Sequence, residues 1–149
     1  MPSWRTGSRT ILELKRINEK VTVSPQISPE DVAAIKAAGF VAIINNRPDG
    51  EAPDQAPSAV IEKAAHDAGL AYHYIPLGRE GVSSQMVEDT KSVLEGSAGP
   101  VFCYCRSGTR STTLWALSQA GKQPAAEIIS AAAHAGYDVS HLAGHLSQK

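Results

Sequence analysis

The sequence has little cysteine, almost no net charge and no long apolar run. Its 149 residues carry a formal net charge of -1, so no basic excess is present to neutralise nucleic-acid phosphates or an anionic membrane surface. No stretch approaches the roughly 18 apolar residues that a membrane span needs. The first 20 residues lack an apolar core with a cleavage-like end, so we expect no signal peptide. These absences predict a cytoplasmic globular protein without nucleic-acid or membrane partners.

The two cysteines, Cys103 and Cys105, are separated by one residue. A disulfide stabilises a fold mainly by closing a long loop, so this pair is a poor structural bridge and a reducing compartment is expected. Both side chains point to one face if the strand continues. Cys103 is expected to be a buried core thiol, and the alternative is a resolving partner for an oxidised Cys105.

Strand and helix signals alternate along the chain. This alternation is typical of an α/β fold with a mainly parallel central sheet flanked by helices, and the length fits a single domain over residues 1–149. Strands are expected at 40–45, 71–77 and 100–105, with a short edge strand in 21–28. Helices are expected at 28–39, 57–68, 83–96, before Gly121, at 124–136 and in the tail.

Three polar loops follow the carboxyl ends of the expected strands. They are residues 45–51, 78–82 and 106–111. Ligands of such sheets bind beyond the carboxyl ends of the strands. We therefore expect the three loops to converge in one site.

The loop after the strand at 100–105 reads CRSGTRS and leads into a helix. Backbone N–H groups at a helix N-terminus attract anions and lower the pKa of a thiol, and glycine permits the tight turn that aims them inward. Arg110 adds a planar fork for oxyanions, and Ser111 can donate a hydrogen bond to a thiolate. The plain alternative is a buried thiol followed by a helix cap. The coincidence of strand end, glycine, arginine and helix start favours Cys105 as a nucleophile. The anion-binding residues expected around it are Arg106, Ser107, Gly108, Thr109 and Ser111.

CRSGTRS resembles the active-site loop of single-domain rhodaneses, which are sulfurtransferases. The wider order INNRPDGE, YHYIPL and CRSGTRS resembles the phosphatase-like domain of beta-lactamase hydrolase-like proteins. The fold of that family is similar to that of the dual-specificity protein tyrosine phosphatases, and the resemblance covers nearly the whole chain. It implies a tyrosine-phosphatase-like fold, Cys105 as the catalytic nucleophile, and an anion cradle formed by Arg110 and the amides of 106–111.

Three features depart from the phosphatase pattern. Phosphatases of this fold place five residues between cysteine and arginine, whereas Cys105 and Arg110 enclose four. A loop shorter by one residue loses about 3.5 Å of contour, which predicts a narrower ring of amides. Tyr104 stands where the phosphatases usually have histidine. The segment IPLGREGVSS has no aspartate acid and offers only Glu80 in its place.

The missing aspartate bears on the reaction. Expulsion of a phenolate, whose conjugate acid has a pKa of about 10, is accelerated roughly 10²–10⁴-fold by a proton donor, whereas sulfur transfer has no such demand. The sequence therefore favours a thiosulfate or persulfide sulfurtransferase that forms a Cys105 persulfide and uses a small-molecule sulfur donor and a thiol acceptor. The family resemblance also suggests a functional link to a persulfide-oxidising enzyme. The alternatives are a phosphatase that acts on phosphoesters through a Cys105 phosphocysteine, and an anion or phosphopeptide binder without turnover.

The loop NNRPDGE is the second group of interest. Arg47 is expected to contact substrate or to support the residues that do, and the plain alternative is a polar turn built on Pro48-Asp49-Gly50. Asp49 or Glu51 as a proton carrier is a weaker alternative. His141 and His145 have helical spacing, but the element order does not bring them to the cysteines, so we expect no metal and no cofactor.

Overall fold

The computed structural model describes residues 12–147. The expected absence of a signal peptide falls largely on residues 1–11, which lie outside this range. The strands are β1 (Lys15–Arg16), β2 (Val21–Ser24), β3 (Ala42–Asn45), β4 (Ala71–Tyr74) and β5 (Val101–Tyr104). The helices are α1 (Asp31–Ala37), α2 (Ser58–Asp67), α3 (Ser84–Gly96), α4 (Thr109–Ser118), α5 (Ala125–Ala135) and α6 (Ala143–Leu146), with a short 3₁₀ turn at Ser140–Leu142.

The five strands form one sheet in the order β1-β2-β5-β3-β4. All neighbours are parallel except β1, which pairs with β2 antiparallel. Strand β5 is central, since it pairs with β2 on one side and with β3 on the other. The predicted α/β class with a mainly parallel sheet flanked by helices is confirmed.

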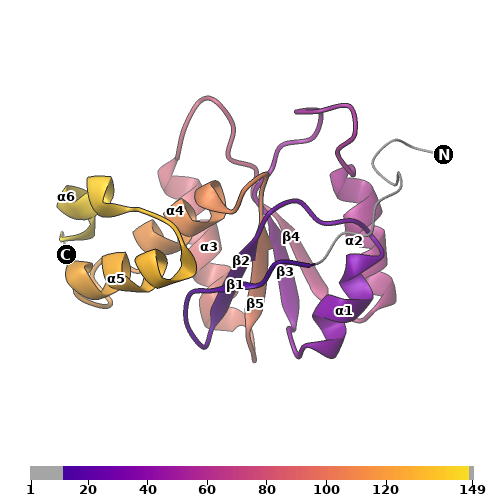
Figure 1. The fold of residues 1–149 in the computed structure, drawn as a ribbon, viewed down its shortest axis with the longest axis horizontal. Coiled ribbons are helices and arrows are strands. Elements are labelled where there is room, and N and C mark those ends of the chain that lie inside the picture. The colour runs from indigo at the N-terminus through magenta and orange to yellow at the C-terminus, as the bar shows by residue number, and fades with distance from the viewer. Residues whose placement is uncertain (1–11, 148–149) are drawn as a thin grey trace.

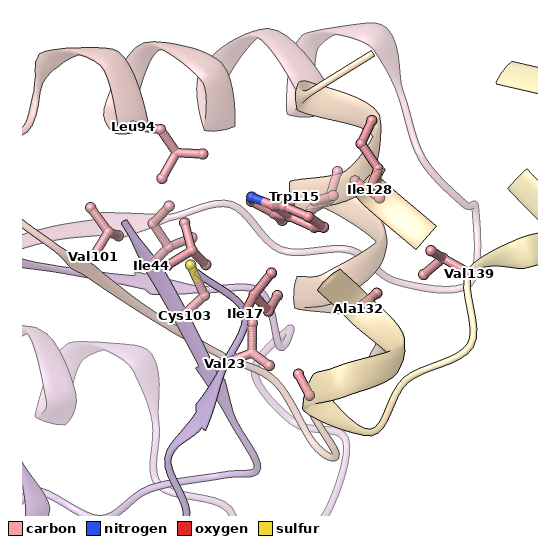
Figure 2. Close-up of a cluster of buried hydrophobic side chains, with 14 of the residues drawn as sticks. Ile17, Val23, Ile44, Leu94, Val101, Cys103, Trp115, Ile128, Ala132 and Val139 are labelled. Carbon is pink, nitrogen blue, oxygen red and sulfur yellow. The ribbon is translucent and has the colours of Figure 1, made fainter. Parts of the chain in front are cut away.

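Helices cover both faces of the sheet. Helices α1 and α2 lie on one face, and α3, α4 and α5 lie on the other (Figure 1). Successive side chains of β5 point to opposite faces of the sheet. Val101 and Cys103 therefore join the core under α3 to α5, while Phe102 and Tyr104 join the core under α1 and α2. Figure 2 shows Trp115 of α4 among the aliphatic side chains of the first core. Within residues 12–147, no helix is long and apolar enough to cross a membrane.

Two of the expected element positions were wrong. The strand predicted in 21–28 is not at the edge, because the two-residue strand β1 pairs with β2 and lies outside it. Helix α1 begins at Asp31 rather than near Ser28. The amide and hydroxyl of Ser28 both donate to the Asp31 carboxylate, at 2.9 and 3.2 Å, so this serine does not cap the helix as an acceptor.

Candidate active site

The cysteine loop connects the central strand to a helix, as the sequence predicts. Strand β5 ends at Tyr104 and α4 begins at Thr109. The amide of Cys105 donates to the carbonyl of Ser24 at 3.3 Å, which ties the start of the loop to β2. The Sγ atom accepts a hydrogen bond from the Gly108 N–H at 3.1 Å. Gly108 has φ of 96°, a left-handed conformation that glycine adopts freely, and this turn aims its N–H at the sulfur.

The remaining loop residues differ in their surroundings. The Ser107 hydroxyl donates to Thr109 Oγ1 at 3.0 Å, and both residues are exposed. The Arg106 side chain is also exposed, while its carbonyl accepts from the Gln26 amide at 3.3 Å. The Ser111 hydroxyl is buried and has no hydrogen-bond partner within the described chain. It does not donate to Cys105 in this structure, so it remains available to a thiolate or an anion.

Arg110 is held in one orientation by acceptors from two other loops. Its Nη1 donates to Glu51 Oε2 and to the Leu77 carbonyl, each at 2.8 Å, and its Nη2 donates to Glu51 Oε1 at 2.8 Å. These bonds use three of the five guanidinium N–H donors. The Nε–H and the second Nη2 hydrogen share the edge that is left for an oxyanion. The hydrogen bond to Glu51 above all raises the pKa of Arg110, and the negative charge of a Cys105 thiolate adds to this effect.

Glu51 is the carboxylate that joins two arginines. Besides Arg110, it accepts from Arg47 Nε at 3.0 Å. The hydrogen bond from Arg110, and to a lesser extent that from Arg47, lowers the pKa of Glu51 to about 2 although partial burial opposes the shift. A carboxyl group with this pKa is ionised at neutral pH. Glu51 is therefore a poor proton carrier and acts as the anchor of Arg110.

Arg47 supports this anchor from the interior. The residue is buried, and its Nη1 donates to Gln26 Oε1 at 3.1 Å while its amide donates to Asn45 Oδ1 at 2.8 Å. Of the two roles expected for Arg47, its described contacts fit support of the site. Asp49 faces elsewhere, since its carboxylate accepts from the Ser58 amide at 2.7 Å and so caps α2.

A cleft of about 630 Å³ opens beside Arg110. Its lining residues are Pro48, Glu51, Pro76, Gly78, Arg79 and Glu80. The cleft adjoins the cysteine loop because Arg110 is held by Glu51, which lines the cleft, and by the carbonyl of Leu77, which lies between the lining residues Pro76 and Gly78. Glu80 is exposed and forms no ion pair with any described residue. The three predicted loops therefore converge, with Glu80 at the cleft.

Cys103 lies in the core rather than in the loop. It packs near Trp115 and Ile44 (Figure 2), and it is 3% exposed. Burial, with a smaller contribution from the charge of Cys105, raises the pKa of Cys103 to about 12, so it stays a thiol at neutral pH. Both cysteines are free. No group of three or more metal-ligating side chains occurs in residues 12–147.

Three groups at the site were not singled out from the sequence. Gln26 follows the carboxyl end of β2, so the rule that identified the other strand-end loops also applied to it. The Leu77 carbonyl is a backbone group and carries no sequence signal. Tyr137 follows α5, and its hydroxyl donates to the Ser107 carbonyl at 2.9 Å. This contact spans 30 residues, and no local pattern indicates it.

Comparison with known proteins gives one consistent family. A family model described as "Beta-lactamase hydrolase-like protein, phosphatase-like domain" matches residues 13–122. The beta-lactamase hydrolase-like protein of Agrobacterium fabrum is 37% identical over 105 residues, which cover 70% of this chain and 24% of that protein. The chain thus spans about a quarter of the length of the curated relatives it matches.

Solved structures agree with this match. A candidate phosphatase from Neisseria meningitidis, nma1982, has a TM-score of 0.76 and 31% identity, covering 89% of this chain and 94% of that one. The kinase associated phosphatase, solved with its catalytic cysteine replaced by serine, has a TM-score of 0.66 over 94% of both chains, and its 14% identity shows the fold alone. The expected tyrosine-phosphatase-like fold and the family resemblance are confirmed.

The sulfurtransferase prediction is wrong. The matched family and the similar structures are phosphatase-like. The two departures that favoured sulfur transfer, the four-residue spacing between Cys105 and Arg110 and the missing aspartate after β4, both lie inside the matched range 13–122. They are variations within a phosphatase-like family rather than marks of another reaction. The sulfur donor, the thiol acceptor, the Cys105 persulfide and the persulfide-oxidising partner lose their support with it.

Proposed function

The chain belongs to the family of beta-lactamase hydrolase-like proteins, phosphatase-like domain, and on this premise we propose that it hydrolyses phosphoesters through a Cys105 phosphocysteine. The observation that supports the proposal most is that Cys105, just before α4, interacts electrostatically with Arg110, whose Nε–H edge is left free by Glu51 and Leu77. This arrangement offers a nucleophile and a fixed bidentate donor to one tetrahedral anion.

In the first step, the Cys105 thiolate attacks phosphorus and forms an S–P bond. The bond from phosphorus to the ester oxygen breaks, and that oxygen leaves with the electron pair and takes up a proton. The amides of 106–111 and the open edge of Arg110 bind the phosphoryl oxygens as their charge redistributes. Glu51 holds that edge in place throughout, because it is bonded to the adjacent Nη1–Nη2 edge of the same guanidinium.

In the second step, a water oxygen attacks the phosphorus of the phosphocysteine. The S–P bond breaks, and its electron pair returns to Cys105 as a thiolate. The water gives up a proton, and inorganic phosphate leaves. The Gly108 N–H, which contacts Sγ at 3.1 Å, stabilises the sulfur as the leaving group of this step.

We assign Glu80 as the proton donor to the departing oxygen. Glu51 is unsuitable, since its pKa of about 2 leaves it ionised. Glu80 lines the same cleft and is free of ion pairs with the described residues. The leaving group would occupy this cleft, because it opens beside Arg110.

Thiolate chemistry and two free cysteines also favour the reducing cytoplasm as the proposed compartment.

The test is phosphate release from an aryl phosphate and an alkyl phosphate by the purified chain. Cys105→Ser should lower kcat/KM by roughly 10³-fold or more, because a serine hydroxyl is far less ionised than a thiol. Cys103→Ala is the control and should retain most of the activity, since the Cys103 thiol packs among the hydrophobic side chains under α3 to α5. Rapid acid quenching should trap one phosphoryl group on Cys105, seen by peptide mass spectrometry.

The same assay examines Glu80. Glu80→Gln should slow the alkyl phosphate more than the aryl phosphate, because an alkoxide needs a proton more than a phenolate does. Equal rates in wild type and Cys105→Ser would refute the phosphocysteine. Tight binding of phosphate without any turnover would instead identify the chain as an anion binder.

A further inference from the structure

The phenol of Tyr137 contacts the phosphate-binding loop from outside it. Tyr137 follows Gly136, the C-cap of α5, and the φ of 103° at this glycine turns the chain out of the helix. Its ring packs against the core under α3 to α5, and its hydroxyl donates to the Ser107 carbonyl at 2.9 Å. A Cβ built on Gly108 would overlap the Tyr137 hydroxyl and lie 2.8 Å from its Cζ. The phenol is therefore packed directly on the Ser107–Gly108 peptide.

The peptide that Tyr137 holds is the one that serves the nucleophile. The Ser107 carbonyl and the Gly108 N–H belong to one planar unit and point in opposite directions. Tyr137 binds the carbonyl side, while the N–H side donates to Cys105 Sγ at 3.1 Å. Fixing the oxygen of a rigid plane fixes the direction of its N–H.

The orientation of this peptide plane needs an external contact because its second residue is a glycine. A peptide plane flips by coupled rotation about the ψ before it and the φ after it, and glycine accepts both signs of φ. Gly108 at φ of 96° could therefore rotate to a negative φ, which would turn the N–H away and point a carbonyl oxygen at the sulfur. A carbonyl dipole would oppose the thiolate that the N–H stabilises.

We propose that Tyr137 is a positioning residue that locks the Ser107–Gly108 peptide with its N–H toward Cys105, so that the segment after α5 helps to keep the nucleophile ionised. Tyr137 lies beyond residue 122, where the match to the family model ends. This positioning role rests on the proposed role of Cys105 as nucleophile but not on any particular substrate.

The phenol acts as a neutral donor. Burial, and then the negative charge of Cys105, raises the pKa of Tyr137 above its usual value, so the hydroxyl keeps its proton at neutral pH. Arg110 on α4, which is paired with Glu51, and Cys103 on β5 also interact electrostatically with Cys105. Tyr137→Phe changes the charge of none of them. A shift in the titration of Cys105 in this variant therefore reports the orientation of the peptide.

The test is the pH dependence of Cys105 alkylation by iodoacetamide, read by mass spectrometry of the peptide that contains it. Tyr137→Phe keeps the packed ring and removes one hydrogen bond. We expect its alkylation profile to move to higher pH by about 0.4 to 1 unit, and kcat/KM on an aryl phosphate to fall roughly 2- to 12-fold near neutral pH. Raising the pH should restore much of the lost alkylation rate.

Tyr104→Phe is the matched control. Tyr104 is adjacent to Cys105, but its buried hydroxyl interacts with Tyr72 on β4 rather than with the cysteine loop, so its removal should leave the profile unchanged. Superimposed profiles for wild type and Tyr137→Phe, or an equal shift in Tyr104→Phe, would overturn the proposal. Alkylation needs no phosphoester, so this result stands even if no phosphatase activity is found.

Discussion

At the scale of single residues, the orientation of Arg110 depends on a carboxylate that no catalytic step consumes. Glu51 binds Arg110 through both oxygens and Arg47 through one of them. Such a clamp is formed only while Glu51 is ionised. Its pKa is lowered from 4.5 to about 2, so its contribution to stability is complete above pH 4.5 and is lost as the pH falls toward 2.

Glu51→Gln tests this clamp. We expect kcat/KM to fall roughly 10-fold at neutral pH, because an amide cannot hold both arginines as a carboxylate does. The variant should also unfold at lower denaturant concentration than wild type at pH 7, and the difference should shrink between pH 4.5 and pH 2. Glu19→Gln, which removes an exposed acid without an ion pair to any described residue, should show no such convergence. A difference that stays constant with pH would argue against the clamp.

At the scale of elements, the loop between β3 and α2 places two carboxylates, Asp49 and Glu51, in different surroundings although they are only two residues apart in the sequence. Glu51 turns toward α4, whereas Asp49 accepts from the Ser58 amide and caps α2. Asp49→Ala should therefore cost about 1 kcal/mol of stability, measured by denaturant unfolding, and leave catalysis largely intact. Asp49→Asn keeps an acceptor oxygen and should be close to wild type in both. Loss of activity on alkyl phosphates in Asp49→Asn would instead make Asp49 a proton carrier.

Most of the elements could be predicted from the sequence, whereas contacts between distant elements could not. Helices and inner strands follow from hydrophobic periodicity and from turn residues such as Gly108 and Gly136, and the strand-end rule brought the three loops together. Strand β1 was missed because a strand of two residues is too short to show alternating hydrophobicity. The Tyr137–Ser107 contact depends on how α5 packs, which no local pattern encodes. The reaction was misjudged because the missing aspartate and the shorter cysteine loop were taken as evidence against a phosphatase, although the family model matches the segments that contain both departures.

At the scale of the whole molecule, we propose that residues 12–147 unfold as one unit, in keeping with the single domain expected over 1–149. The two cores lie on opposite faces of the same sheet and share strand β5, so neither can persist without the other. In a Trp4→Phe background, Trp115 emission reports the core under α3 to α5, and far-UV circular dichroism reports all the helices. The two signals should give one denaturation midpoint. Separate midpoints would mean that the layers are independent.

The central place of β5 has a consequence for the order of events during synthesis. Strands β2 and β3 do not pair with each other but with β5, which the ribosome delivers about two-thirds of the way through the chain. Cys105 follows at once, and the residues whose contacts we propose to orient its surroundings, Gly108 and then Tyr137, come later still. A nascent chain that has not closed its sheet therefore lacks the Gly108 N–H contact to Cys105 Sγ. Under the proposed function, the contacts around Cys105 are therefore complete only after the sheet has closed and α5 has docked.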